Sequence, residues 1–349
     1  MRVLVTGGAG FIGSAVVRFL INQTNEDVFN VDSLTYAGDL KNVEDAARSQ
    51  RYHFAKVDLC DLESLRDVFS SFMPHSVIHL AAESHVDRSI YNPSKFIQTN
   101  ILGTYNLLEV TRDYLENTHP ALTKEFRFLH VSTDEVYGSL PHPKYSLDAK
   151  KLRFSEKSAY APNSPYAASK AGADHLVRAW GNTYALPVLI TNSSNNYGEY
   201  QFPEKFIPLL IINALLGKNL PIYGNGENIR DWLYVEDHAQ AIYLVLREGK
   251  IGESYNIGGN CELQNTEVAK LICDTLEASG ADKPAGVKNY HDLIEFVSDR
   301  AGHDLRYAID TTKIRKELAW KPEHQFKIGL RKTVDWYINN KAWWQQTLR

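Results

Sequence analysis

A glycine-rich segment near the N-terminus constrains the fold of this chain more than any other feature. Residues 3–14 read VLVTGGAGFIGS: an apolar run leads into the glycines, and a helix-forming pattern begins near Phe11. Glycines at this spacing allow a tight turn and a close approach to a pyrophosphate, while the helix N-terminus offers free N–H groups. The alternative is a glycine-rich loop without a ligand. Because a strand precedes the glycines and a helix follows, we expect a dinucleotide to contact Gly7, Gly10, Phe11, Ile12 and Gly13.

The acid at the end of the second apolar run indicates which dinucleotide binds. Asp32 stands 19 residues after Gly13, where a carboxylate accepts hydrogen bonds from a ribose diol. A 2′-phosphate would be repelled there, and no arginine follows in residues 33–35, so the sequence favours NAD over NADP. Asp58 and Leu59 follow the third run, at a position suited to the adenine. Asp58 could equally be a helix N-cap.

The first half of the chain alternates between short apolar runs and longer amphipathic segments, which is typical of repeated βαβ units. We therefore predict an α/β fold, a Rossmann-type doubly wound parallel sheet with a smaller C-terminal substrate-binding domain. Residues 1–191 form the expected NAD-binding domain, with segments near 232–260 as candidates to return to it, and residues 192–349 form the substrate domain. The predicted strands are 2–6, 27–32, 52–57, 76–80, 126–132 and 187–191.

Composition excludes several classes of partner and site. A formal charge of −4 and a pI near 6.3 provide no basic field for nucleic acid or an anionic membrane. The longest apolar run, 206–216, is interrupted by Asn213 and is too short to span a bilayer. No signal-peptide layout is visible, so we expect a cytoplasmic protein. Cys60, Cys261 and Cys273 form no CxxC pair, and we expect neither disulfides nor a metal.

Tyr166 and Lys170 form a candidate redox pair. They are four residues apart in SPYAASKAGADHL, a helix-forming segment, so both side chains lie on one helical face. A phenol has an ordinary pKa of about 10, and a nearby ammonium lowers it. Tyr166 could then accept a proton from a substrate alcohol while a hydride leaves for nicotinamide. The alternative is a tyrosine on a core face with the lysine in solvent.

Two consecutive carboxylates follow the predicted strand 126–132. Thr133, Asp134 and Glu135 come at the carboxyl end of this strand, where open α/β sheets bind their ligands. A simple alcohol dehydrogenase needs no further acid or base. A dehydratase needs one group to take a C–H proton and another to protonate the departing hydroxyl. The alternative is a solvated acidic turn.

The glycine turn and the YxxxK pair together resemble the short-chain dehydrogenase/reductase superfamily, in its extended branch. The segments HLAAESHVDRS, STDEVYG, YAASK, SNNYGEYQFPEK, GNGENIRDWLYVEDHA and DRAGHDLRYAID further resemble, in order and spacing, the dTDP-glucose 4,6-dehydratase family. This resemblance implies an NAD-dependent hydro-lyase of deoxysugar biosynthesis that makes dTDP-4-keto-6-deoxy-D-glucose and water, with tightly bound NAD regenerated at each turnover. It also implies roles: Thr133 contacts the reacting oxygen, Tyr166 is the redox base, Glu135 removes the C5 proton and Asp134 protonates the C6 hydroxyl.

The resemblance also implies the remaining binding residues. To the cofactor set it adds Ala81, Thr99, Tyr166, Lys170 and Asn195. The implied substrate set is Ser84, Thr133, Asn195, Asn196, Lys205, Tyr223, Arg230, Asn265, Arg300 and His303. A nucleotide diphosphate needs cations in a chain with net negative charge, although each cation alone could be a surface charge or a loop cap. We interpret His85 as structural. Glu199 and Ala301 depart from the family pattern, which has proline at both positions.

Two rival functions stay open from the residues alone. A nucleotide-sugar 4-epimerase or simple dehydrogenase of the same fold would need no Asp134 and Glu135. A catalytically silent, dinucleotide-sensing regulator would be expected to lack part of the set formed by Thr133, Tyr166 and Lys170. The family resemblance further implies a homodimer that pairs through helices of the first domain.

Overall fold

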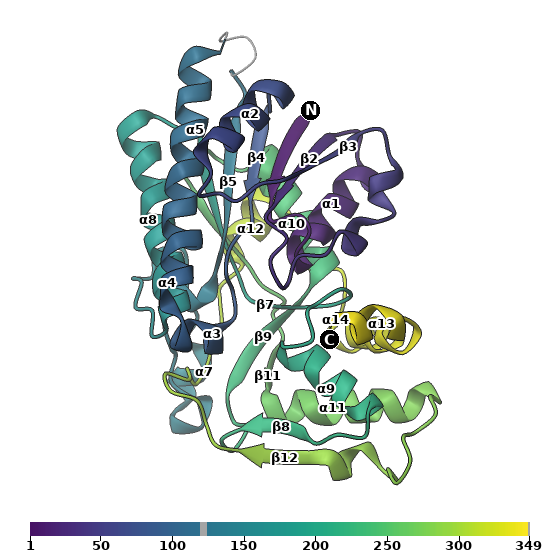
Figure 1. Cartoon of the computed structure of the whole chain (residues 1–349). Coiled ribbons are helices and arrows are strands. Elements are labelled where there is room, and N and C mark those ends of the chain that lie inside the picture. Colours follow the sequence, from purple (N-terminus) through teal and green to yellow (C-terminus); the bar gives the residue numbers. More distant parts are fainter. Residues whose placement is uncertain (119–123, 348–349) are drawn as a thin grey trace.

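The computed structural model describes residues 1–118 and 124–347 (Figure 1). Its centre is a seven-stranded sheet in the order β10-β6-β5-β4-β1-β2-β3, in which every pair of neighbours is parallel. This confirms the predicted doubly wound parallel sheet. The strands are β1 (Arg2–Thr6), β2 (Asp27–Asp32), β3 (Tyr52–Lys56), β4 (Ser76–His79), β5 (Arg127–Thr133), β6 (Val188–Ser193) and β10 (Ser254–Ile257).

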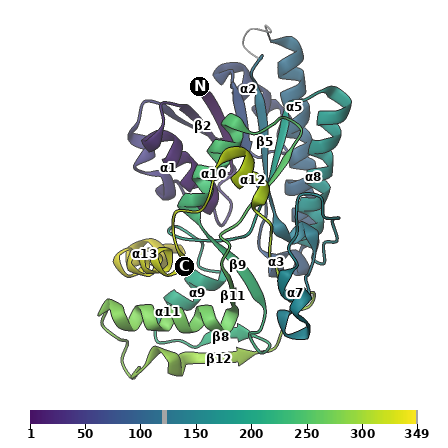
Figure 2. The same cartoon turned by 180° about the vertical axis from the view of Figure 1, so that it is seen from behind.

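Helices cover both faces of this sheet, as Figures 1 and 2 show from opposite sides. One face carries α1 (Phe11–Gln23), α10 (Val235–Glu248) and α12 (Thr312–Leu318), packed on a core that includes Val16, Leu20 and Ile242. The other face carries α2 (Leu62–Phe72), α5 (Gly103–Asn117) and α8 (Pro165–Tyr184), packed on a core that includes Leu107 and Val177. The central strands are therefore buried on both sides, which explains the apolar runs in their sequences, whereas the edge strand β3 keeps two exposed residues.

Three elements of this layer, α10, β10 and α12, come from the second half of the chain. β10 pairs in parallel with β6, while α10 and α12 share the core of α1. We therefore propose that the cofactor domain consists of residues 1–191 together with these three elements, and that the rest of residues 192–349 forms the substrate domain.

A smaller layer lies below the carboxyl ends of the large sheet (Figure 1). It contains a three-stranded sheet of β11 (Glu262–Gln264), β9 (Ile229–Tyr234) and β7 (Asn195–Tyr197), and a two-stranded sheet of β12 (Ile294–Val297) and β8 (Leu220–Tyr223). The helices α9 (Phe206–Leu215), α11 (Asn265–Ser279), α13 (Phe326–Asn339) and α14 (Lys341–Thr347) pack around a separate aromatic-rich core. The remaining short helices are η1 (Leu40–Val43), η2 (Ala46–Arg48), α3 (Val86–Tyr91), α4 (Pro93–Phe96), η3 (Ile97–Leu102), η4 (Asp134–Tyr137), η5 (Pro143–Tyr145), α7 (Leu147–Lys151) and η6 (Tyr290–Leu293).

Local sequence signals fix the two helices that border the site. Gly7 adopts a φ of +73°, which favours glycine, and the helix α1 begins at Phe11. Helix α8 begins at Pro165, and the hydroxyl of Ser164 accepts a hydrogen bond from the Ala167 N–H at 3.1 Å. Among the described residues, no helix combines the length and the apolar character that crossing a bilayer requires.

Candidate active site

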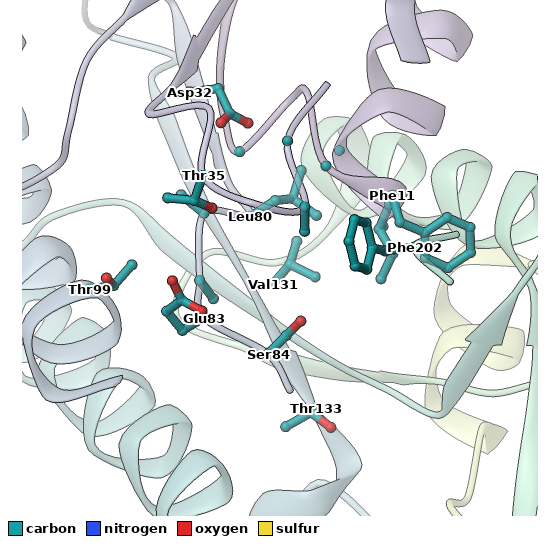
Figure 3. A pocket seen from close by; sticks show the side chains of 18 of the residues that line it. Phe11, Asp32, Thr35, Leu80, Glu83, Ser84, Thr99, Val131, Thr133 and Phe202 are labelled. Carbon is teal, nitrogen blue, oxygen red and sulfur yellow. The ribbon is translucent and has the colours of Figure 1, made fainter. Parts of the chain in front are cut away.

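A cavity of about 310 Å³ lies where the large sheet meets the smaller layer. All the residues that we predicted to bind the cofactor line it, from the glycine turn to the redox pair. Figure 3 shows Asp32 and Thr133 at opposite ends of this cavity. Its shape therefore suits an elongated ligand whose one end lies at β2 and whose other end lies at β5. The predicted cofactor residues in its wall are Gly7, Gly10, Phe11, Ile12, Gly13, Asp32, Asp58, Leu59, Ala81, Thr99, Tyr166, Lys170 and Asn195.

The glycine turn is packed so closely at Gly7 and Gly13 that neither position has room for a side chain. A Cβ atom on Gly7 would lie 2.7 Å from the Ala81 Cα, and one on Gly13 would lie 2.0 Å from the Gly7 carbonyl oxygen. The turn thus presents bare backbone and the N-terminus of α1 to the cavity. This is the arrangement that a pyrophosphate requires, so the residues fit NAD.

Asp32 and Asp58 occupy different positions along the adenosine end. The Asp32 carboxylate accepts hydrogen bonds from the N–H groups of Ala9 (2.9 Å) and Leu34 (2.8 Å), which fixes its orientation. Asp58 accepts from the Cys60 N–H at 2.9 Å, whereas Asp61 caps α2. The alternative role of Asp58 as the N-cap of that helix is therefore wrong.

The redox pair lies on one face of α8, and both side chains are buried at the cavity wall. Tyr166 is 8 % exposed and Lys170 is 4 % exposed, which contradicts the alternative of a lysine in solvent. The Lys170 ammonium donates to the Val131 carbonyl at 2.9 Å. Burial lowers the pKa of Lys170 to about 8, and the charge of Asp174 opposes this fall.

The net shift of the Tyr166 pKa is upward, whereas we expected Lys170 to bring this pKa down. Burial raises the pKa of the Tyr166 phenol, and the charge of Glu135 raises it further, while a hydrogen bond with Thr133 acts in the opposite direction. Removing the phenol from water favours its neutral form, and the nearest carboxylate adds repulsion to the phenolate. An ammonium on the same helical face therefore acts against both burial and the charge of Glu135.

The two acids lie next to the redox pair and not in a solvated turn. Thr133 is the last residue of β5 rather than the first residue after it, and η4 begins at Asp134. Asp134 is 1 % exposed, and its Oδ2 atom has no hydrogen-bond partner among the described residues. Burial raises the pKa of Asp134 well above its ordinary value, and the charge of Glu135 adds to this rise. Asp134 itself is not in the cavity wall.

Glu135 reaches the cavity and has a different charge environment from Asp134. It shares the wall with Tyr166, Lys170 and Thr133. Burial raises the pKa of Glu135, but Arg300, Arg230 and Lys205 oppose the rise. Two neighbouring carboxyls thus have distinct environments, which is the condition under which one serves as an acid and the other as a base.

The predicted substrate residues fall into two groups. Ser84, Thr133, Asn195, Asn196 and Lys205 line the cavity, and Lys205 donates to the Ser84 carbonyl at 2.7 Å. The other group does not contribute to the wall and consists of Tyr223, Arg230, Asn265, Arg300 and His303.

Three of the four cationic residues in the predicted substrate set, Arg230, Arg300 and His303, belong to the second group, and only Lys205 lines this cavity. Arg230 is buried and donates to the carbonyls of Ile229 (2.8 Å) and Asp304 (2.9 Å). Arg300 pairs with Asp87 at 3.3 Å, and His303 lies 2.6 Å from Asp299. In this structure all three side chains thus have protein partners. The electrostatic effect of Arg230 and Arg300 on Glu135 nevertheless places their charge near the site.

Sequence reasoning missed many wall residues because most are small or apolar and carry no reactive group. Their shared signal is position, since several directly follow the carboxyl ends of β2, β3, β4 and β6. The residues missed are Val31, Ser33, Thr35, Ala37, Gly38, Val57, Leu80, Ala82, Glu83, Val131, Ser132, Ser193, Ser194, Gln201, Phe202 and Glu204.

Comparison with known proteins agrees with this geometry. The family model described as GDP-mannose 4,6 dehydratase matches residues 4–333. A dTDP-glucose 4,6-dehydratase of Escherichia coli is 56 % identical over all of this chain and 96 % of its own length. The dTDP-glucose 4,6-dehydratase of Neisseria meningitidis serogroup B is 57 % identical over 99 % of this chain and 96 % of its own length. This chain belongs to the dTDP-glucose 4,6-dehydratase family.

A solved member of the family has the same architecture. The crystal structure of a dTDP-glucose 4,6-dehydratase from Streptomyces venezuelae, with NAD and TYD bound, is 44 % identical with a TM-score of 0.87, and the match covers 99 % of this chain and 100 % of that one. The family recognised from the motifs is therefore confirmed. Membership in this family also favours the dehydratase function over the 4-epimerase function.

Proposed function

We propose that this chain is a dTDP-glucose 4,6-dehydratase, an NAD-dependent hydro-lyase. It converts dTDP-glucose to dTDP-4-keto-6-deoxy-D-glucose and water by oxidation at C4, elimination across C5 and C6, and hydride return to C6. The observation that carries the proposal is that Glu135 shares one cavity wall with Thr133, Tyr166 and Lys170. A redox set alone would serve an epimerase or dehydrogenase, whereas the added carboxylate provides the base for an elimination.

The redox step uses the end of the cavity at β5. NAD, when bound, accepts the C4 hydride and returns it to C6, so it is regenerated in each turnover. The residues of the glycine turn and Asp32 would hold its pyrophosphate and ribose. Tyr166 takes the proton of the C4 hydroxyl, Thr133 hydrogen-bonds the same oxygen, and the Lys170 ammonium favours the phenolate against the effects of burial.

The elimination uses the two acids in different protonation states. Once C4 is a ketone, the C5 proton is acidified, and Glu135 removes it. The cations near Glu135 favour its ionised form, as a base requires. Asp134 is held in its protonated form by burial and donates its proton to the C6 hydroxyl, which leaves as water.

The nucleotide end of the substrate extends beyond the cavity wall toward the smaller layer. We propose that Ser84, Asn195, Asn196 and Lys205 contact the sugar end of the substrate. The diphosphate and base then lie by Tyr223, Arg230, Asn265, Arg300 and His303, where cations offset the phosphate charge.

An experiment in heavy water tests this function. Turnover of dTDP-glucose should place solvent deuterium at C5 of a 4-keto-6-deoxy product, because Glu135 exchanges its proton with solvent before the double bond is reduced. Recovery of unlabelled glucose or galactose isomers would identify a 4-epimerase, and the absence of any turnover would favour a dinucleotide-sensing regulator. A panel of nucleotide-glucoses in the same assay should show the fastest reaction with the dTDP form.

We also propose a cytoplasmic homodimer with no nucleic-acid partner. Support for the dimer comes from exposed apolar side chains on neighbouring helices of the cofactor domain, which we call the η3/α5/α8 face. It comprises Ile97 and Leu102 on η3, Tyr105 on α5 and Tyr184 on α8. Self-association would remove these side chains from water. The net charge of −4 opposes binding to nucleic acid.

A further inference from the structure

A buried charged group lies directly behind the redox pair. Asp174 follows Lys170 by four residues on α8, so Tyr166, Lys170 and Asp174 form one stripe along the helix. Asp174 is 0 % exposed. A carboxylate so completely removed from water needs a partner, because an isolated buried charge is unfavourable by many kcal/mol.

His130 lies between the two charges. Its Nε2 atom is 3.5 Å from the Lys170 Nζ and 3.1 Å from the Asp174 Oδ1. Burial, with a contribution from the charge of Lys170, lowers the pKa of His130 to about 4, so its ring is neutral at neutral pH. The same atom of a neutral ring thus contacts both an ammonium and a carboxylate inside the protein.

Hydrogen bonds to its second oxygen hold Asp174 in its ionised form. The Asp174 Oδ2 atom accepts from the hydroxyls of Ser132 (2.9 Å) and Tyr160 (2.8 Å) and from the Asn192 amide (3.3 Å). Burial alone would raise the pKa of Asp174, but His130, Lys170 and Ser132 outweigh it and lower the pKa. The carboxylate therefore persists as a charge near Lys170.

The other titratable groups around this pair do not replace that charge. Arg178 donates to the Tyr160 hydroxyl at 3.1 Å, and this hydroxyl in turn donates to Asp174. Along this series of contacts, Asp174 lies between Arg178 and Lys170. His79 on β4 packs against His130 with ring centroids 5.1 Å apart, and burial lowers its pKa well below the ordinary value, so it is neutral. Glu135, on η4, acts on the phenol of Tyr166. Among the described residues, Asp174 is the group whose charge favours the ammonium form of Lys170.

We infer that Asp174 is a positioning residue for the redox step: acting across His130, its buried carboxylate is the counter-charge that keeps Lys170 an ammonium beside Tyr166. The inference rests on the proposed function, because it assigns Asp174 a task in the oxidation at C4. Without the counter-charge, Lys170 would lose its proton within the working pH range and could no longer favour the phenolate.

The protonation of Lys170 can be measured without turnover. Competitive labelling of the protein with acetic anhydride over a range of pH, followed by peptide mapping, gives the pH midpoint at which each lysine becomes reactive. In Asp174→Asn the midpoint of Lys170 should fall by about one pH unit or more, since an opposite charge at close range shifts a pKa by roughly one to three units. Asp174→Glu, which restores the charge, should return the midpoint toward that of the wild type.

Tyr160→Phe is the matched control, because it removes a hydrogen bond to Asp174 and keeps the carboxylate. Its Lys170 midpoint should stay within a few tenths of a pH unit of the wild type. A shift in Tyr160→Phe as large as that in Asp174→Asn would show that packing, not charge, controls Lys170. If Asp174→Asn does not fold, Asp174→Ser should give the same fall, and an unchanged midpoint in whichever variant folds overturns the inference.

A second measurement separates this inference from the proposed function. In a Glu135→Gln background, the absorbance of NADH reports oxidation at C4 without elimination. Addition of Asp174→Asn should move the alkaline limb of this oxidation to lower pH by about the same amount as the labelling midpoint. Failure of Glu135→Gln alone to form NADH would count against the proposed function. If NADH forms with the same pH profile in Glu135→Gln and in the double variant that also carries Asp174→Asn, the result would count against the role of Asp174.

Discussion

Glu135 and Tyr166 face the same cavity from two different elements, and the charge of Glu135 raises the pKa of the Tyr166 phenol. Glu135 follows β5 on η4, whereas Tyr166 lies in the first turn of α8. In the proposed reaction these are the bases for two successive protons, from the C4 hydroxyl and from C5. Because the two groups interact, the proton on one affects the acidity of the other. The oxidation and the elimination are therefore electrostatically coupled.

Glu135→Gln should separate the two steps. The amide cannot accept the C5 proton, so formation of the keto-deoxy product should fall by about 10²- to 10⁴-fold, the usual contribution of a general base. NADH should still form, because Tyr166, Lys170 and Thr133 are unchanged. Absorbance of NADH and chromatography of the sugar nucleotide measure the two steps. Glu227→Gln is the control, since Glu227 is exposed and pairs with Lys144. Full dehydratase activity in Glu135→Gln would refute the assigned role.

The same substitution should change the pH dependence of the oxidation. Glu135 raises the pKa of Tyr166, so loss of its charge lowers that pKa. Tyr166 acts as a base only after it has lost its own proton. The acid limb of the pH profile of NADH formation should therefore move to lower pH in Glu135→Gln. Rapid-mixing measurements over a pH series test this. An acid limb displaced to higher pH would mean that Glu135 assists the phenolate instead of opposing it.

Asp134→Asn should block the reaction one step later than Glu135→Gln. The asparagine amide is not an acid, so the C6 hydroxyl can no longer leave as water, and product formation should fall by about 10²-fold or more. Glu135 can still remove and return the C5 proton. In heavy water, sugar nucleotide recovered from Asp134→Asn should therefore carry deuterium at C5, whereas that from Glu135→Gln should not. Equal labelling by both variants would contradict the division of roles between the two acids.

Gly13→Ala should damage the cofactor turn more than Gly10→Ala. A Cβ on Gly13 would lie 2.0 Å from the Gly7 carbonyl oxygen, while a Cβ on Gly10 would lie 3.4 Å from the same atom, an ordinary contact. Overpacking of this kind destabilises a protein by roughly 1–3 kcal/mol. Thermal melting of the cofactor-free proteins should show a lower Tm for Gly13→Ala and little change for Gly10→Ala. Equal melting of the two variants would mean that the turn tolerates a side chain at Gly13.

The sequence predicted the strands well because their apolar runs are short and followed by turns, and because the central strands are buried on both faces. The predicted strands 2–6 and 27–32 match β1 and β2, and the others differ only at their ends. The presence of the predicted cofactor residues in one cavity wall has a related reason. Their spacing is set locally by the turn after β1 and by the ends of successive strands, so that sequence position determines location in space.

Residues whose environment depends on long-range packing were predicted less well. The spacing of Tyr166 and Lys170 predicted that both lie on one helical face, but it could not predict how deeply they are buried. Burial raises the pKa of the Tyr166 phenol, which is opposite to the expected direction. Arg230 and Arg300, predicted as substrate cations, do not line the cavity and instead contact carbonyl groups and Asp87. Asp174 carries no motif of its own. The role that we infer for it depends on the contact with His130, which β5 places beside it.

The η3/α5/α8 face predicts how two copies of the chain associate. Ile97 is 51 % exposed and Leu102 is 45 % exposed, although both are apolar. A specific dimer interface buries about 1,600 Å² in total and excludes charge from its centre. Analytical ultracentrifugation should therefore show a dimer, and Leu102→Glu should convert it to a monomer by placing a charge in the interface. Ile328→Glu is the matched control, because Ile328 on α13 is 53 % exposed and lies outside this face. If Leu102→Glu remains dimeric, the copies pair through another surface; if the wild type is monomeric, the exposed helices require another explanation.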